Sequence, residues 1–87
     1  MTEAQLNISE KLRSIQNQTN SLDWQEISEE MKEFGCRGLN PHTIKNYLFG
    51  NVPNRTDKIH SATIVYRLAL AKIENRNRMV AELKQAS

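Results

Sequence analysis

The chain has 87 residues, of which 38% are hydrophobic and only five are aromatic. This is material for one small domain, residues 1–87, with little left to enclose a catalytic cavity, so a non-enzymatic protein is favoured. No apolar run approaches the roughly 20 residues that cross a membrane, and the first residues lack the features of a signal peptide. We therefore expect no membrane association and a cytoplasmic location. Cys36 is the only cysteine, which excludes an internal disulfide.

Charge is unevenly distributed along the chain. Residues 1–34 hold three basic and seven acidic side chains, a net charge of −4. Residues 35–87 hold nine basic and three acidic side chains, a net charge of +6. A domain polarised in this way presents a basic side to a polyanion while its acidic side faces away.

Apolar residues recur with helical spacing in four segments, and no segment alternates with the period of a strand. The first, about 3–17, ends at a polar run, residues 17–20. Its apolar face is formed by Ala4, Ile8, Leu12 and Ile15, with Leu6 off that face.

The second segment begins at Ser21 or Asp23, where the sequence from Asp23 to Glu26 fits a capping box. It ends at Gly35, a residue suited to the left-handed conformation. One apolar stripe, predicted to face the core, consists of Trp24, Ile27, Met31 and Phe34. The opposite face is acidic and carries Glu26, Glu29, Glu30 and Glu33.

The third segment, 41–49, has the clearest boundaries. Asn40 is its cap, Pro41 takes the first helical position and Gly50 ends it. The inward side chains are Ile44, Tyr47 and Leu48. The face opposite Ile44 carries His42, Lys45, Asn46 and Phe49, with Thr43 at its margin.

The last segment, about 57–84, follows a cap at Thr56. Its main apolar stripe consists of Ile59, Ala62, Val65, Tyr66, Ala69, Leu70, Ile73, Val80 and Leu83. A second apolar set, on another side, consists of Ile64, Leu68, Ala71 and Met79. Either a second copy of the chain covers this second set as a dimer seam, or the first helix folds back over it. The sequence thus predicts an all-α domain of four helices with a long C-terminal helix.

The third segment has the side chains needed to read DNA. A major groove admits one α-helix, whose amide, hydroxyl and basic side chains bond to base edges. We predict that His42, Thr43, Lys45 and Asn46 face bases. The predicted phosphate contacts are Arg37, Asn40, Asn51, Asn54, Arg55 and Lys58.

Residues 22–56 resemble the repressor-like helix-turn-helix proteins of bacteria and phages. The support positions are Ile27 and Ser28, and the reading-helix positions are Thr43, Ile44, Tyr47, Leu48 and Gly50. The resemblance implies sequence-specific binding of double-stranded DNA by a small transcriptional regulator, and a dimer seam on helix 57–84 would make it a homodimer. The chain departs from the family in its extended turn, residues 35–39, where the compact motif has a turn of three or four residues.

The sequence is also compatible with other functions. A protein–protein adaptor or inhibitor of phage or plasmid type would use the second apolar face of the C-terminal helix instead. Stacking of single-stranded bases on the aromatic residues is a minor alternative. Cys36, His42 and His60 are too widely spaced for a metal site, so no metal, cofactor or small-molecule ligand is expected.

Overall fold

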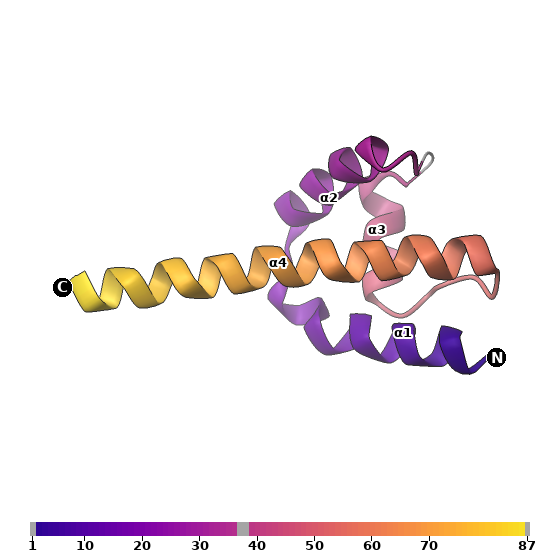
Figure 1. Cartoon of the computed structure of the whole chain (residues 1–87), viewed down its shortest axis with the longest axis horizontal. Coiled ribbons are helices and arrows are strands. Elements are labelled where there is room, and N and C mark those ends of the chain that lie inside the picture. The colour runs from indigo at the N-terminus through magenta and orange to yellow at the C-terminus, as the bar shows by residue number, and fades with distance from the viewer. Residues whose placement is uncertain (1, 37–38, 87) are drawn as a thin grey trace.

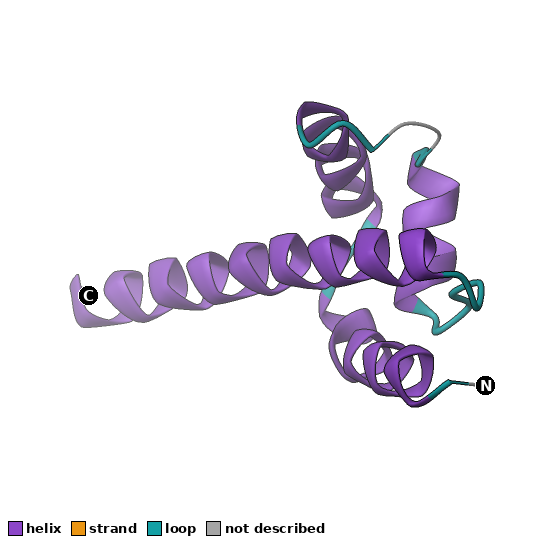
Figure 2. Cartoon of the chain, turned by 45° about the vertical axis from the view of Figure 1, so that its right-hand side comes forward, coloured by secondary structure: helices purple, strands orange, loops and turns teal. Residues whose placement is uncertain are grey.

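A computed structural model describes residues 2–36 and 39–86. The helices are α1 (Glu3–Ile15), α2 (Ser21–Glu33), α3 (Pro41–Leu48) and α4 (Thr56–Ala86), with a 3-10 turn, η1 (Gln16–Gln18), after α1. The described residues contain no strand, which confirms the predicted all-α class. The long α4 has α1 along one side and α2 on the other, and α3 crosses behind α4 from the side of α2 toward that of α1 (Figures 1 and 2).

Each of the first three helices begins at a side chain that accepts a hydrogen bond from a backbone N–H of the first turn. Thr2 caps α1, and Asn40 caps α3 by accepting from the Thr43 N–H at 2.8 Å, with Pro41 next to it as predicted. The capping box of α2 begins three residues before its predicted position. Asn20, not Asp23, is the cap, and Asp23 is the acidic residue that reaches back to the Asn20 N–H.

Helices α2 and α3 end in the same way. Gly35 and Gly50 have φ angles of 77° and 92°, the left-handed conformation predicted for Gly35. In each case the following residue donates its N–H five residues back, from Cys36 to the Met31 carbonyl and from Asn51 to the Asn46 carbonyl, both at 3.0 Å. These bonds satisfy carbonyls that the helix leaves without partners, so both helices stop at defined residues.

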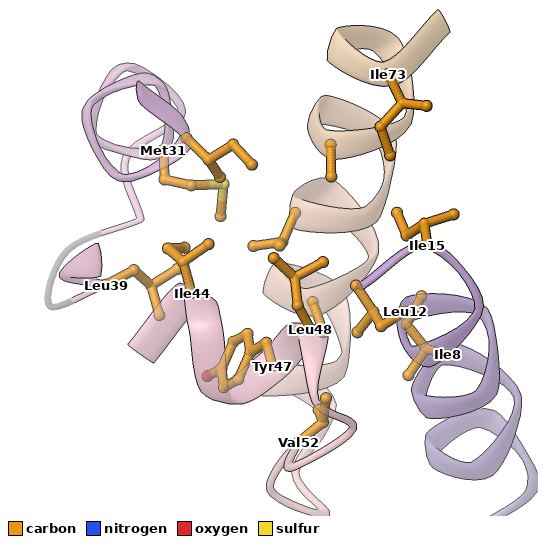
Figure 3. Close-up of a cluster of buried hydrophobic side chains, with 14 residues drawn as sticks. Ile8, Leu12, Ile15, Met31, Leu39, Ile44, Tyr47, Leu48, Val52 and Ile73 are labelled. Carbon is orange, nitrogen blue, oxygen red and sulfur yellow. The ribbon is translucent and has the colours of Figure 1, made fainter. Parts of the chain in front are cut away.

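The core lies where the four helices meet (Figure 3). Ile44 and Leu48 of α3 have no exposed surface, and neither do Leu12, Ile27 or Val65 from the other three helices. The complete set of buried apolar residues is Ile8, Leu12, Ile15, Ile27, Met31, Leu39, Ile44, Tyr47, Leu48, Val52, Ala62, Val65, Ala69 and Ile73. Helix α3 is therefore held by its inner face in the centre of the domain.

Two buried polar side chains attach the segments on either side of α3. The Ser28 hydroxyl of α2 donates to the Leu39 carbonyl at 2.6 Å, just before α3. The Gln5 amide of α1 donates to the Val52 carbonyl at 2.6 Å, just after α3. Because a buried carbonyl without a partner is costly, these bonds fix both connections to the neighbouring helices.

Some residues expected in the core are exposed. Phe34 is 60% exposed, because α2 ends there and the chain turns away at Gly35. Ala4 is exposed as well, and Gln5 takes its place on the buried face of α1.

The main stripe of α4 is buried only as far as Ile73. From 74 to 85 every side chain is exposed, including Val80 and Leu83, because α4 projects past the ends of α1 and α2 (Figure 1). We call residues 74–85 the α4 extension.

The second apolar set of α4 is divided by the same geometry. Ile64 and Leu68 are half-buried and pack against the core, whereas Ala71 and Met79 are exposed. Helix α1 does not cover the exposed pair, since it lies along the side of α4 that carries Ile59 and Tyr66.

Polar contacts at the base of the extension join α4 to α2. Arg76 donates to both oxygens of the buried Asp23 carboxylate, at 2.7 and 2.8 Å, and to the Gln18 carbonyl at 3.0 Å. Lys72 donates to Glu26 and Glu30, at 3.0 and 2.9 Å. Burial alone would lower the pKa of Lys72, but the hydrogen bonds and the negative charges of Glu30 and Glu26 together outweigh burial and raise it.

We predict that Gly50→Ala destabilises the domain more than Gly35→Ala. Both changes force a left-handed alanine, which costs about 1–2 kcal/mol. At Gly50 a Cβ would also approach Arg13, whose side chain would have to move, whereas nothing lies within 4 Å at Gly35. Urea unfolding followed by circular dichroism measures the two losses, and equal losses would show that the Arg13 contact adds no constraint.

We also predict that Arg76→Met lowers the free energy of unfolding by about 2–3 kcal/mol, because it leaves the buried Asp23 carboxylate without its cation. The loss should shrink in an Asp23→Asn background, where no buried charge remains. Arg78→Met, an exposed position on the same helix, serves as the control and should change little. Chemical unfolding of these variants gives the coupling energy, and purely additive losses would contradict the interpretation.

Candidate nucleic-acid interface

The outer face of α3 is polar and accessible. His42 is exposed, and Lys45 and Asn46 are half-buried. Phe49, the last member of this predicted face, is 44% exposed. The face lies opposite the buried Ile44, as the sequence predicted, so these side chains form one continuous strip along the helix.

The first turn of α3 is organised by its cap. Asn40 accepts from both the backbone N–H and the hydroxyl of Thr43, at 2.8 and 3.1 Å. Both residues were predicted to contact DNA. The Thr43 hydroxyl donates its proton to the cap, so what it offers a ligand is an acceptor and a methyl group.

Lys45 lies against two aromatic rings. Its Nζ is 5.5 Å from the centre of the Trp24 ring and 5.8 Å from that of Phe49. Trp24 stands in the first turn of α2, half-buried, and its indole N–H donates to the Thr19 hydroxyl at 3.1 Å. We call Trp24, Lys45 and Phe49 the aromatic clamp. The apolar spacing of residues 24–34 predicts Trp24 in the core, and no local pattern brings it next to Lys45, which lies on a different helix.

The segment after α3 supplies further polar groups. Asn51, Asn54 and Arg55 are exposed, and Lys58 in the first turn of α4 is half-buried. Asn54 accepts from the Thr2 hydroxyl at 3.1 Å, and Arg55 pairs with Asp57 at 3.3 Å on the surface. Such exposed pairs contribute little, so Arg55 can exchange its partner at small cost. Arg37, another predicted phosphate contact, lies outside the described residues.

Arg13 reaches this region from α1, although it belongs to the N-terminal part of the sequence, residues 1–34, whose net charge is negative. Its side chain lies directly against Gly50, at the end of α3. The only signal in the sequence was the glycine itself, whose missing side chain leaves room for the arginine. Among the described cations, Lys45 lies on α3, Arg13 lies against its end, Arg55 is in the loop that follows, and Lys58 is in the first turn of α4.

Tyr47 connects this surface to the core. Its side chain is buried on the inner face of α3. Burial raises the pKa of Tyr47 above its ordinary value, the charge of Asp57 adds to the rise, and the charge of Arg55 opposes it. The phenol is therefore neutral at physiological pH and presents no negative charge beside Arg55.

The described residues form shallow hollows between α4 and its neighbours and no cluster of metal-ligating side chains. One surface hollow, of about 410 Å³, lies between α2 and α4; Phe34, Leu68 and Ala71 line it together with the acidic Glu30 and Glu33. No group of three or more His, Cys, Asp or Glu side chains in the described ranges is arranged to hold a metal ion. None of the described helices is long and apolar enough to cross a membrane.

Comparison with known proteins gives no family: no protein-family model, curated protein or solved structure matches this chain.

Proposed function

We propose that the protein binds double-stranded DNA in a sequence-specific manner, with α3 in the major groove, as a small transcriptional regulator. One observation carries the proposal. Helix α3 is buried along one face and attached at both ends through Leu39 and Val52, while its other face presents His42, Lys45 and Asn46. A short helix held rigidly, with its polar side outward, is what major-groove reading requires.

The chemistry of the exposed side chains divides the contacts into two kinds. Asn46 can bond bidentately to adenine, and His42 can donate to or accept from a base edge. Arg13 lies against the end of α3, and Arg55 and Lys58 follow α3 in the chain. These cations suit phosphate contacts, which position a protein without reading sequence. Asn51 and Asn54 offer amide donors to phosphates from the loop after α3.

The arrangement of α2 is compatible with a supporting helix. It contacts α3: Ile27 and Met31 share the core with Ile44 of α3, and the Ser28 hydroxyl fixes the end of the extended turn at Leu39. Its acidic residues Glu26 and Glu30 are directed toward Lys72 of α4, not toward the outer face of α3. The negative charge of α2 is thereby partly neutralised, which reduces its repulsion of a phosphate backbone.

We predict that Asn46→Ala relaxes sequence preference, whereas Arg55→Ala weakens binding to all duplexes and lowers the slope of log affinity against log salt by about 1. The matched control is Arg78→Ala, which removes an exposed arginine from the α4 extension and should leave the slope unchanged. Fluorescence anisotropy with a random duplex and a selected duplex, at several salt concentrations, measures each quantity.

Two outcomes would contradict the proposal. Absence of duplex binding by the wild-type protein at low salt would remove DNA as the ligand. An equal loss from Arg55→Ala and Arg78→Ala would show binding through diffuse positive charge and not through the surface around α3.

A second candidate function, protein–protein association, is favoured by exposed apolar side chains along the α4 extension and beside its base. These are Leu22, Met79, Val80 and Leu83, the last 69% exposed. Isolated helices in water are marginal, and a patch of this kind is characteristic of an interface. A second copy of the chain is the simplest occupant, and as a homodimer it would supply two reading helices for a two-fold symmetric site.

We predict that in sedimentation equilibrium the wild-type protein is a dimer and the Leu83→Glu variant is a monomer. Ala81→Glu is the matched control, because it adds the same charge about 200° around the same helix and should leave the dimer intact. A wild-type protein that stays monomeric at high concentration would rule out self-association, and the patch would then fit the adaptor function with a different partner.

A further inference from the structure

We propose that the aromatic clamp holds Lys45 ready for a phosphate at the edge of the groove, so that Lys45 is a phosphate contact and not a base reader. The inference rests on the proposed DNA binding and changes the role that sequence analysis gave to this residue. Trp24 and Phe49 are then positioning residues, because they act on DNA through Lys45.

The direction of the Lys45 side chain favours a phosphate contact. The ammonium lies between Phe49 at the C-terminal end of α3 and Trp24 in the first turn of α2. It is therefore drawn away from the N-terminal turn of α3, where His42 is exposed. In helix-turn-helix docking the N-terminal residues of the reading helix meet base edges, while the preceding helix crosses the backbone. A cation between the two helices is placed for the backbone.

In the absence of DNA, the partners of the Lys45 ammonium are aromatic rings and not carboxylates. Lys45 has no carboxylate contact among its described interactions, and the faces of two rings stabilise the ammonium instead. Arg55 and Lys72, in contrast, are paired with acids. A ring face attracts the cation without neutralising its charge, so Lys45 keeps its full attraction for a phosphate.

The clamp also reduces the conformational freedom of the Lys45 side chain before DNA binds. A lysine side chain has many rotamers, and ordering it on binding opposes association. The clamp restricts Lys45 before DNA arrives, so less freedom remains to be lost. Phe49 is suited to this task because it is itself partly exposed, one helical turn from Lys45, where it can cover the lysine stem without being part of the core.

The test is a double-mutant cycle of Lys45→Met and Phe49→Leu, read by anisotropy on the random and selected duplexes across salt. Lys45→Met should weaken binding equally on both duplexes and lower the salt slope by about 1. Phe49→Leu should weaken binding about two- to fivefold, the equivalent of one cation–π contact, with the slope unchanged. The double variant should bind no more weakly than Lys45→Met alone. Trp24→Phe, which keeps an aromatic face, should retain most of the affinity.

The clamp can also be measured without DNA. In the free protein the ε-methylene protons of Lys45 should resonate upfield because of the ring currents, and Phe49→Leu should reduce that shift. An unshifted signal would overturn the inference, as would additive losses in the cycle or a Lys45→Met variant with altered sequence preference and an unchanged salt slope. Absence of duplex binding by the wild-type protein would instead overturn the proposed function, and this inference with it.

Discussion

The burial of Ile44 and Leu48 is the constraint on which the rest of the structure depends. These two side chains have no exposed surface, and they bring α3 into contact with the other helices. An eight-residue helix is too short to be stable alone in water, so its conformation comes from this packing and from its caps. Because the inner face of α3 is fixed, its outer face can point in only one direction. The buried residues therefore decide which side chains of α3 form the surface.

Much of the fold could be predicted because its signals are local. Apolar spacing, the Asn40–Pro41 start and the two glycine ends depend on residues within a few positions of each other, and they gave the four helices and their approximate limits. The capping box of α2 was misplaced by one turn because Asn20 and Asp23 are both good caps by type. Only the contact of Asp23 with Arg76, from the other end of the chain, shows why Asp23 is buried.

The site was predictable in its outline but not in its connections. The spacing within α3 gave its outer residues, whereas the positions of Trp24 and Arg13 depend on how α2 and α1 cross α3, which no local pattern records. The same limit applies to charge. Arg13, from the acidic part of the sequence, lies beside α3, and Lys72 and Arg76 of α4, from the basic part, bind Glu30 and Asp23 of α2. Charge counted along the chain therefore describes the molecular surface only in part.

The length of α4 has a consequence for anything attached to its end. The helix comprises 31 residues and accounts for most of the 48 Å long axis of the molecule. Its first half is fixed in the core, so the second half acts as a rigid arm that transmits direction as well as distance. Each residue inserted into such an arm advances its tip by about 1.5 Å and turns it by about 100°. A change in length by one residue would therefore point the tip toward a different side of the molecule, and restoring its direction would take about seven residues, close to two full turns.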